Sequence, residues 1–363
     1  MRAAAGSGSS GLLQSKPHVW VLAGEKPGDN AQLLSLAGAL GWPFEVKQLR
    51  FRAPRSRFVT LAGREQFPLD KAASSPLTAP WPDLVIGCGQ RSVAVALRIR
   101  RQAGGSTRLV WLGRPRVDLD RFDLVLTTPQ YRVPEHRNVL HLALPLHRVD
   151  RDAWDRAAVE WEGRFAALPR PWIAVLVGGS AVPFVFDVPT ARRLAGQANT
   201  LARAEGGSLL VSTSRRTPPE AARALSEALA VPAYVHHWSP GGGPNPYFAY
   251  LALADAFIAT GDSASMLTEA CSTGKRVWIA ELPEQRSFRS HAKNFLRHSV
   301  LAATPGLTKR GWIRNPRDLH RLHAELIAAN RALPLGRPFT APPPPPADET
   351  GLAVARVRAL FSR

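Results

Sequence analysis

The chain has few cysteines, few lysines and no long apolar run. Its two cysteines, Cys88 and Cys271, are far apart and lack metal-ligand spacing, which argues against a disulfide framework and a zinc site. No apolar segment reaches the roughly 18–20 residues that span a bilayer. Residues 1–16 lack the basic and apolar regions of a secretory signal, and we expect a disordered tail there. Together these absences predict a protein of the reducing cytoplasm.

Motifs of several enzyme classes are also absent. The first predicted strand is not followed by the G-x-G-x-x-G of a nicotinamide dinucleotide site, and no Walker sequence or G-x-S-x-G occurs. None of the four tyrosines has a lysine four residues later, which argues against the Tyr–Lys pair of a short-chain-type sugar epimerase. His236 and His237 have no further ligands at a convincing spacing. We therefore predict neither a metal nor a cofactor.

What the chain has in excess is arginine. Lys and Arg number 47 in 363 residues, the formal net charge is +19, and only seven of the basic residues are lysine. Arginine binds phosphate well, so nucleotides, anionic lipid and nucleic acid are all candidate partners. The arginines are scattered and no nucleic-acid-binding motif is present. We therefore predict no nucleic-acid partner.

Short apolar runs alternate with amphipathic segments along most of the chain, which predicts parallel sheets covered by helices on both faces. We predict an α/β protein with two Rossmann-like domains facing a cleft. The first six strands are expected near residues 18–23, 44–49, 84–86, 109–112, 124–126 and 139–142. The predicted parts are a first domain (17–147), a connector (148–170), a second domain (171–335), and a proline-rich tail with a terminal helix (336–363). The sequence leaves open whether that helix docks on the first domain.

The most informative stretch is 255–281, which reads as a strand, a polar turn, a helix and a strand. Asp262 or Ser263 can cap the helix, and Gly274 can end it. A helix start rich in N–H groups and hydroxyls suits a phosphate. Glu269 follows two turns later on the same face, where its carboxylate can accept the hydroxyls of a ribose. The simpler interpretation is an ordinary βαβ unit with a capped helix and a solvated glutamate.

Two further polar turns of the second half follow predicted strands, and we expect all three turns to converge. Glycine lets the backbone approach a ligand closely, and Arg215 or Arg216 can neutralise a diphosphate. The predicted nucleotide-binding residues are Gly178, Gly179, Ser180, Ser214, Arg215, Thr260, Gly261, Asp262, Ser263, Ser265 and Glu269.

In the first half we expect the loops 24–30, 87–92, 113–116 and 127–132 to share one edge of the sheet. Glu25 and Asp29 lie in the first of these loops and are the candidate catalytic bases. The alternative is that Asp29 or Asn30 caps the helix that follows, while Glu25 is solvated.

Arginines alternate with aromatic and apolar residues in the stretch 50–64. Arg50, Arg52, Arg55 and Arg57 can bind an anionic membrane surface. A solvated loop with a few anchoring aromatics explains the same pattern.

Several segments together resemble the mitochondrial-fission family named for elongated mitochondria. They are GEKPGDNAQ (24–32), PDLVIGCGQRS (82–92), LVLTTPQYRVP (124–134), VGGS (177–180) and ATGDSASMLTEACSTGKRVW (259–278). The resemblance covers about residues 17–335. For the plant members it implies a cytosolic protein that recruits a dynamin-related GTPase at the outer mitochondrial surface. The arginine-rich composition favours a bacterial member.

The second half also resembles glycosyltransferases of the two-Rossmann GT-B type, such as the murein lipid-linked transferase. This resemblance implies that Ser180 and Glu269 hold the diphosphate and ribose of a nucleotide sugar. The first hypothesis is therefore a glycosyltransferase at or near the inner membrane face, with a nucleotide sugar as substrate. The alternatives are a sugar epimerase of the same architecture and a non-catalytic adaptor with a protein partner.

Overall fold

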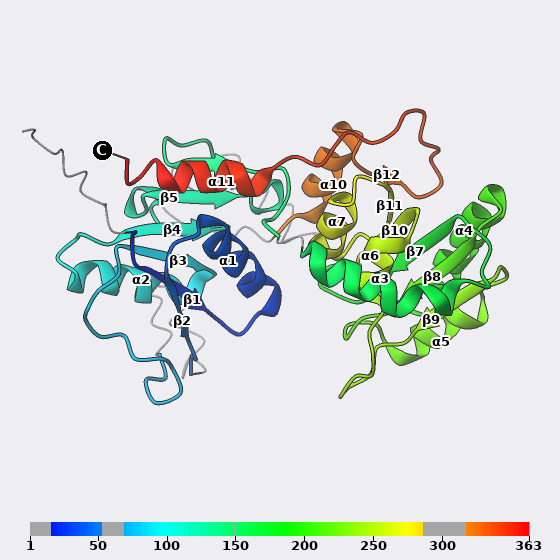
Figure 1. Cartoon of the computed structure of the whole chain (residues 1–363), viewed down its shortest axis with the longest axis horizontal. Helices are drawn as coiled ribbons and strands as arrows, with labels where there is room; N and C mark the ends of the chain where they lie inside the picture. Colours follow the sequence, from blue (N-terminus) through cyan, green and yellow to red (C-terminus); the bar gives the residue numbers. More distant parts are fainter. Residues whose placement is uncertain (1–15, 53–68, 116, 148–149, 286–316, 363) are drawn as a thin grey trace, which may run out of the picture.

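The structure is a computed structural model that describes residues 16–52, 69–115, 117–147, 150–285 and 317–362 (Figure 1). It has two lobes, and each is built on one six-stranded, all-parallel sheet. The predicted fold class, an α/β protein with two Rossmann-like domains, is confirmed. We call the part that carries the first sheet the first domain and the part that carries the second sheet the second domain. The domain limits given above stay a prediction.

The first sheet has the strand order β2-β1-β3-β4-β5-β6. Alternate residues of β1 pack on opposite faces: Val19 and Val21 against α1 and α11, Trp20 and Leu22 against α2. Every residue of this strand is therefore buried, as expected of a parallel sheet covered on both faces. The strands are β1 (Val19–Ala23), β2 (Phe44–Gln48), β3 (Leu84–Cys88), β4 (Arg108–Leu112), β5 (Leu124–Thr127) and β6 (Val139–His141). The helices are α1 (Pro27–Leu40), α2 (Gln90–Gln102) and, from the end of the chain, α11 (Glu349–Arg358).

The second sheet has the order β12-β11-β10-β7-β8-β9. Its strands are β7 (Trp172–Leu176), β8 (Ser208–Ser212), β9 (Ala233–His236), β10 (Ala256–Thr260), β11 (Arg276–Ala280) and β12 (Leu333–Pro334). Its helices are α3 (Arg151–Phe165), α4 (Val188–Glu205), α5 (Pro219–Glu227), α6 (Tyr247–Leu253), α7 (Ala264–Cys271) and α10 (Leu319–Ala328). The central strands β7, β8 and β10 are buried along their whole length.

Each sheet has a point where the strand order reverses. In the first sheet the chain leaves β1 toward β2 on one side and returns to β3 on the other. In the second sheet β8 and β9 lie on one side of β7, whereas β10, β11 and β12 lie on the other. The loops after two neighbouring strands diverge at such a point and leave a crevice that binds ligands in open α/β sheets.

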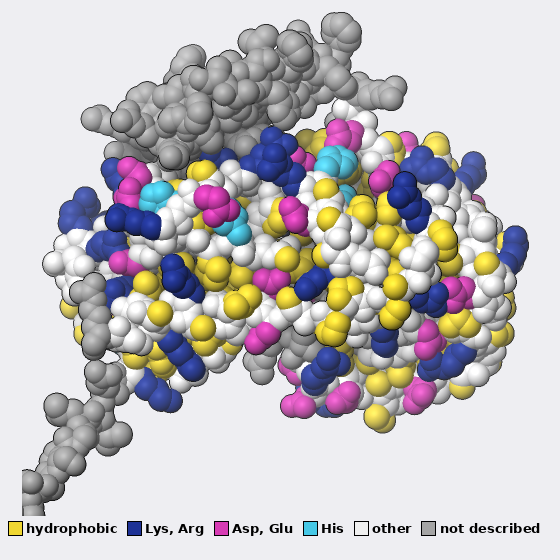
Figure 2. Space-filling view, turned by 90° about the horizontal axis from the view of Figure 1, so that it is seen from above, with side chains coloured by type: hydrophobic (Ala, Val, Ile, Leu, Met, Phe, Trp, Pro, Cys, Tyr) yellow, Lys and Arg dark blue, Asp and Glu magenta, His cyan; other side chains and the backbone are white. Residues whose placement is uncertain are grey.

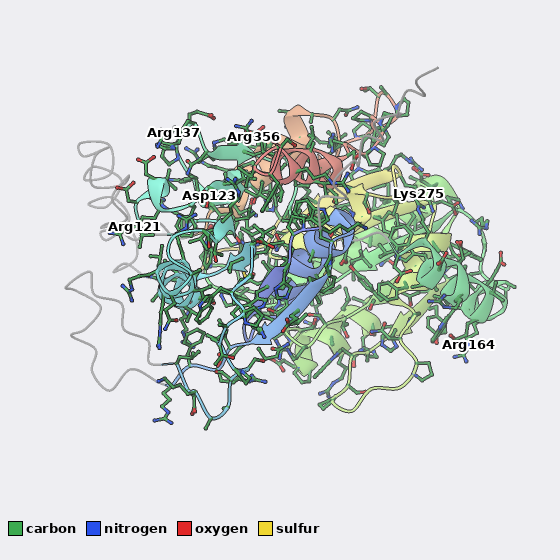
Figure 3. All side chains as sticks on the ribbon, turned by 60° about the vertical axis from the view of Figure 1, so that its left-hand side comes forward. Arg121, Asp123, Arg137, Arg164, Lys275 and Arg356 are labelled. Carbon is green, nitrogen blue, oxygen red and sulfur yellow. The ribbon has the colours of Figure 1, made fainter. Side chains whose placement is uncertain are left out.

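The end of the chain contacts both domains. The Trp278 indole Nε1 donates to the carbonyl of Arg337 at 2.8 Å, and the Trp278 and Phe339 rings lie edge to face on the second domain. Helix α11 then packs on the first domain beside α1 (Figure 1). Figure 3 shows Arg356 of this helix beside Arg137, whose carbonyl accepts a hydrogen bond from it at 3.3 Å. The terminal helix therefore docks on the first domain, which the sequence had left open.

A second contact between the domains joins the start of α10 to the short helix η3 (Pro129–Tyr131). The backbone N–H of Asp318 donates to the carbonyl of Gln130 at 2.9 Å, and the Asp318 carboxylate forms an ion pair with Arg132. Arg132 has a positive φ of 51°, a left-handed conformation that is uncommon outside glycine. The neighbouring Arg317 guanidinium lies 5.5 Å from the centre of the Tyr131 ring. Neither α10 nor this contact was predicted from the sequence.

Most predicted strands and helices agree with the structure to within a few residues, but the start of α1 differs. The helix begins at Pro27, with Lys26 in the capping position, so neither Asp29 nor Asn30 is its cap. Proline fits the first position of a helix because its missing N–H would be unpaired there anyway. Asn30 instead exchanges two hydrogen bonds of 2.9 Å with the backbone of Gly24 and fixes the loop before the helix.

Candidate functional site

The three polar turns predicted to converge do meet, at the strand-order reversal of the second sheet. Thr260 at the end of β10 accepts a hydrogen bond from the Gly178 N–H at 2.8 Å, just beyond β7. The Gly178 carbonyl in turn accepts from the hydroxyl of Thr217 at 3.1 Å and from that of Ser214. The turn after β8 also binds the first turn through the Ser180 N–H and the Arg216 carbonyl, 3.2 Å apart. These hydrogen bonds therefore hold the three turns in position relative to one another.

Asp262 lies at the centre of this junction. Its side chain is fully buried, accepts from the Thr260 hydroxyl at 2.7 Å and forms an ion pair with Arg216 at 2.6 Å. Burial raises the pKa of this carboxyl, while Arg216 and Thr260 act in the opposite direction. A Cβ on Gly178 would lie 2.4 Å from an Asp262 oxygen, so only glycine fits there. Of the two arginines considered from the sequence, Arg216 reaches the junction and Arg215 is exposed.

Helix α7 starts at this junction. The Ser263 side chain caps it by accepting from the Met266 N–H at 3.5 Å, so of the two predicted caps the structure selects Ser263. The Gly261 N–H donates to the Ala280 carbonyl at 2.9 Å, and the Gly261 carbonyl pairs with His323 Nε2 at 2.9 Å. Ser265, in the first turn, is exposed. Of the hydroxyls predicted to bind a phosphate at this helix start, that of Ser265 is therefore the exposed one.

Glu269 lies one turn further along α7, and it is not solvated. Its carboxylate accepts a hydrogen bond from the hydroxyl of Tyr247 in α6. Burial raises the pKa of Glu269, and the bond from Tyr247 lowers it in part. Burial and the adjacent carboxylate together raise the pKa of Tyr247 well above its usual value. The residue predicted to bind a ribose is thus held in place by a neighbouring helix.

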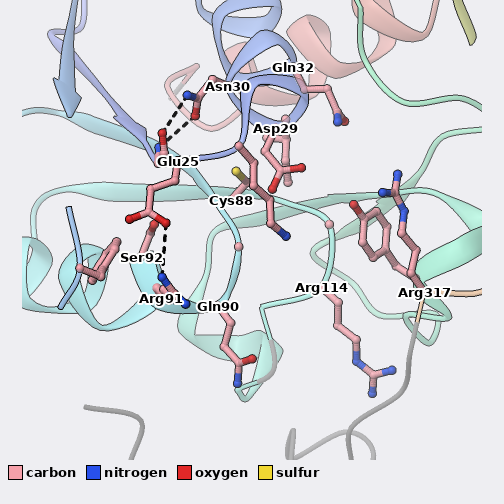
Figure 4. A pocket seen from close by; sticks show the side chains of 17 residues that line it. Glu25, Asp29, Asn30, Gln32, Cys88, Gln90, Arg91, Ser92, Arg114 and Arg317 are labelled. Atoms are coloured by element: carbon pink, nitrogen blue, oxygen red, sulfur yellow. Dashed lines mark hydrogen bonds and ion pairs between the residues drawn. The ribbon is translucent and has the colours of Figure 1, made fainter. Parts of the chain in front are cut away.

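At the strand-order reversal of the first sheet lies a cavity of about 470 Å³ (Figure 4). It is lined by the loops after β1, β3, β4 and β5, so the prediction that these four loops share one edge is confirmed. Eleven of its 17 lining residues have charged or polar side chains: Glu25, Lys26, Asp29, Asn30, Gln32, Gln90, Arg91, Ser92, Arg114, Tyr131 and Arg317.

Both candidate catalytic carboxylates line this cavity, in different surroundings. Glu25 forms an ion pair of 3.5 Å with Arg91, and each side chain is 46% exposed. Asp29 lies between Cys88 and Arg317 (Figure 4). Its negative charge contributes to the raised pKa values of the Cys88 thiol, about 12, and of Tyr131, although burial is the main cause in both. Cys88 is therefore a protonated thiol at neutral pH.

Several lining residues of the cavity were not predicted from the sequence. Lys26, Arg91, Arg114 and Tyr131 lie within the loops that were expected at this edge, so their place in those loops was the available signal. Arg317 comes from the second domain and had no such signal. No cluster of three or more His, Cys, Asp or Glu residues able to hold a metal occurs among the described residues.

The basic stretch proposed to bind a membrane is described only in part. Arg50 is exposed, and Arg52 forms an ion pair of 3.1 Å with Asp70. Arg55 and Arg57 lie outside the described residues. On the face shown in Figure 2, Lys and Arg side chains are spread over both domains and are not gathered in one stripe. Among the described residues no helix has the length and apolar character needed to cross a bilayer.

Comparison with known proteins gives the family. The sequence model described as Mitochondrial fission ELM1 matches residues 27–316. The chain belongs to this family. The mitochondrial fission protein ELM1 of Arabidopsis thaliana is 33% identical over 221 residues, which cover 54% of this chain and 51% of that protein. The chain thus spans about half the length of this relative. The uncharacterized protein RP120 of Rickettsia prowazekii (strain Madrid E) is 22% identical over 308 residues, 75% of this chain and 85% of that protein.

Solved structures align with nearly the whole length of this chain, but their backbones agree with it only modestly. MurG of Acinetobacter baumannii has a TM-score of 0.45 and 15% identity, with coverage of 94% of this chain and 99% of that one. A glycosyltransferase of Rickettsia africae ESF-5 has a TM-score of 0.48 and 8% identity, with coverage of 95% and 98%. The UDP-GlcNAc 2-epimerase of Methanocaldococcus jannaschii has a TM-score of 0.47 and 11% identity, with coverage of 95% and 99%.

Proposed function

We propose that the protein is a glycosyltransferase that uses a nucleotide sugar. The observation that carries this proposal is that each sheet presents polar groups at its strand-order reversal, where α/β sheets bind ligands. The turns of the second domain would hold the nucleotide, and the cavity of the first domain would hold the acceptor. A transferase needs two such sites because donor and acceptor must be oriented against each other.

In the second domain, the start of α7 and the hydroxyls of Ser265 and Ser180 would bind the diphosphate, with Arg215 as an exposed counter-charge. Glu269 would accept the ribose hydroxyls. Its hydrogen bond from Tyr247 fixes the carboxylate in one orientation before the ligand arrives. The internal bonds among Gly178, Thr260 and Asp262 keep the backbone of the turns rigid.

In the first domain, Asp29 would act as the general base. It would take the proton of an acceptor hydroxyl while the hydroxyl oxygen forms the bond to the anomeric carbon and the bond from that carbon to the diphosphate breaks. The products are a glycoside, a nucleoside diphosphate and a proton. Glu25 is less suited to this role because its carboxylate is already engaged in an ion pair with Arg91.

Nucleotide binding is tested by thermal shift with UDP, GDP, ADP and their sugars. A ligand that binds the folded state raises the melting temperature by mass action, by an amount that grows with its concentration. We expect a shift with at least one nucleotide in the wild-type protein and in Glu227→Ala, which removes an exposed glutamate at the end of α5. We expect no shift in Glu269→Ala. Absence of a shift from every nucleotide at millimolar concentration would refute the proposal.

A second candidate is a non-catalytic adaptor, and membership of the fission family favours it. Such a protein binds a protein partner and needs no nucleotide. A wild-type protein that binds no nucleotide yet binds a protein partner would support this function. The thermal-shift experiment therefore discriminates between the two candidates.

A cytoplasmic location at the inner membrane face is part of the proposal. Pelleting with vesicles that contain anionic lipid tests it. Replacement of Arg50, Arg52, Arg55 and Arg57 by serine is expected to lower the bound fraction. An unchanged bound fraction would mean that these four arginines do not bind the membrane.

A further inference from the structure

Asp318 lies at the capping position of α10, but its side chain does not cap that helix. Its backbone has the extended conformation of a capping residue, with φ −114° and ψ 93°, yet among the described residues its carboxylate accepts no hydrogen bond from the first turn of α10. Aspartate precedes α3, α4 and α11 in the same way, and there each carboxylate accepts from the N–H three residues later: Asp150 from Ala153, Asp187 from Thr190 and Asp348 from Gly351. The Asp318 carboxylate therefore lacks a bond that this residue type makes at three other helices of the chain.

The Asp318 carboxylate binds the first domain instead. It forms an ion pair with the Arg132 guanidinium, and the two side chains are only 19% and 23% exposed. The Asp318 N–H donates to the Gln130 carbonyl at 2.9 Å, two residues before Arg132. The attraction in an ion pair that is partly removed from water is screened less than that in a surface pair. A bond between the domains has thus replaced the bond that would fix the start of α10.

This contact between the domains also has unfavourable features. Gln130 is completely buried, and among the described residues neither its amide oxygen nor its amide nitrogen has a hydrogen-bond partner. Arg132 has a left-handed backbone with a φ of 51°, and its buried Nε has no partner within the described residues either. Buried polar groups without partners and left-handed residues other than glycine both cost free energy. The contact therefore depends on the Asp318–Arg132 ion pair to offset these costs.

The same contact forms one side of the first-domain cavity. Tyr131 belongs to η3, Arg317 directly precedes Asp318, and both Tyr131 and Arg317 line the cavity. Their side chains lie next to each other in Figure 4, with the Arg317 guanidinium 5.5 Å from the centre of the Tyr131 ring. Among the described lining residues, Arg317 is the one that the second domain supplies. This side of the cavity therefore exists only while the two domains are in contact.

We propose that Asp318 is a switch between a latched and an open arrangement of the two domains. In the latched arrangement, which is the one described above, Asp318 pairs with Arg132, and Tyr131 and Arg317 form one side of the cavity. In the open arrangement the Asp318 carboxylate caps α10 by accepting from the Arg321 N–H, three residues later, and Arg317 leaves the cavity with the second domain. The new cap offsets part of the cost of breaking the ion pair. A compound that contacts Tyr131 and Arg317 at once favours the latched arrangement, because it binds that arrangement better.

Amide hydrogen exchange of the full chain, measured by mass spectrometry at single-residue resolution, tests this switch. The Asp318 N–H is protected by the Gln130 carbonyl only in the latched arrangement, and the Arg321 N–H is protected by the Asp318 carboxylate only in the open one. The variant is Arg132→Gln, which removes the ion pair between the domains. Its control is Arg137→Gln, which removes an ion pair at the surface of the first domain. Melting temperatures establish that both variants fold.

In Arg132→Gln we expect the two amides to change in opposite directions. The Asp318 N–H should exchange about tenfold faster, because the charge-assisted bond that holds the contact is lost. The Arg321 N–H should exchange about threefold or more slowly, because the freed carboxylate caps the helix. Both exchange rates should stay unchanged in Arg137→Gln. Addition of Asp318→Ala to Arg132→Gln should abolish the slower exchange of the Arg321 N–H, since no carboxylate is left to cap α10.

A second variant tests the switch by another route. Asparagine caps helices as well as aspartate does but carries no charge, so Asp318→Asn should give the same opposite changes at residues 318 and 321. In whichever of the two variants folds, faster or unchanged exchange of the Arg321 N–H would overturn the inference, because removal of an ion pair without a switch only loosens the contact. The inference goes beyond the proposed function, which thermal shift with nucleotides tests separately.

Discussion

The hydroxyl of Tyr247 donates a hydrogen bond to the carboxylate of Glu269, and this bond joins α6 to the helix that carries the candidate nucleotide site. Both side chains are largely buried, so the carboxylate depends on this donor. Burial raises the pKa of Glu269, which means that the folded state binds its proton more tightly than the unfolded chain. The contribution of Glu269 to stability is therefore greatest below its usual pKa of 4.5 and falls as the pH rises through the folded value.

From this bond we expect a pH-dependent cost for Tyr247→Phe. The variant leaves a buried carboxylate without its donor and should lose about 1–3 kcal/mol at pH 8. At pH 5 the cost should be smaller, because a protonated Glu269 is less penalised by burial. Urea unfolding at the two pH values measures it. Tyr250→Phe is the control, since Tyr250 donates to the neutral Val211 carbonyl at 3.3 Å, and its cost should not change with pH. Equal costs for Tyr247→Phe at both pH values would contradict this account.

His323 predicts a second pH effect, of opposite sign. It is buried, with its Nε2 on the Gly261 carbonyl, and burial lowers its pKa from 6.5 to about 4. The folded protein therefore holds His323 in its neutral form. The contribution of neutral His323 to the free energy of unfolding is complete above pH 6.5 and is lost as the pH falls toward 4. The loss amounts to roughly 3 kcal/mol at about 1.4 kcal/mol per pKa unit. His323→Gln does not titrate, and we expect its unfolding free energy to fall less than that of the wild type between pH 7 and 4.5. Parallel pH profiles would show that His323 does not cause the loss.

The docking of α11 gives a prediction on stability. Val357 is completely buried in the core of the first domain, whereas Leu352 on the same helix is 56% exposed. Val357→Ala removes buried apolar surface and should cost about 1–3 kcal/mol. Leu352→Ala should change stability by less than about 0.5 kcal/mol. Urea unfolding of both variants checks this, and a similar small effect for both would mean that the helix is not docked in solution.

Gly179 tests the packing of the second-domain turns. It has a φ of +127°, and an added Cβ would lie 2.2 Å from the Arg216 carbonyl oxygen. Gly179→Ala must therefore move backbone and should cost more than about 2 kcal/mol. Gly196, in the exposed face of α4, has no atom within 4 Å of such a Cβ. Gly196→Ala should be neutral or stabilising by up to about 1 kcal/mol, because alanine favours a helix. Thermal unfolding measures both, and a tolerated Gly179→Ala would show that the turns are not closely packed.

Much of the fold could be predicted because most of its strands are short apolar runs that alternate with helical segments. The first six strands were predicted with bounds that differ from those of the structure by at most two residues. Prediction was poorer where the local signal is weak. β12 has only two residues, too few to show a pattern. Helix α1 starts at Pro27, before Asp29 and Asn30, the two residues whose side chains are typical of helix caps.

The sequence by itself determined which segments end in polar turns and which residues those turns carry, because apolar runs and turn residues are local properties. It could not determine the order of the strands, since parallel pairing depends on contacts between segments far apart in the chain. That order places the turns after β7 and β10, and those after β1 and β3, at the two reversals. Only the tertiary structure pairs Glu269 with Tyr247, selects Arg216 for Asp262 and brings Arg317 to a cavity of the other domain. Each of these relationships joins side chains on different elements, and packing of those elements decides them.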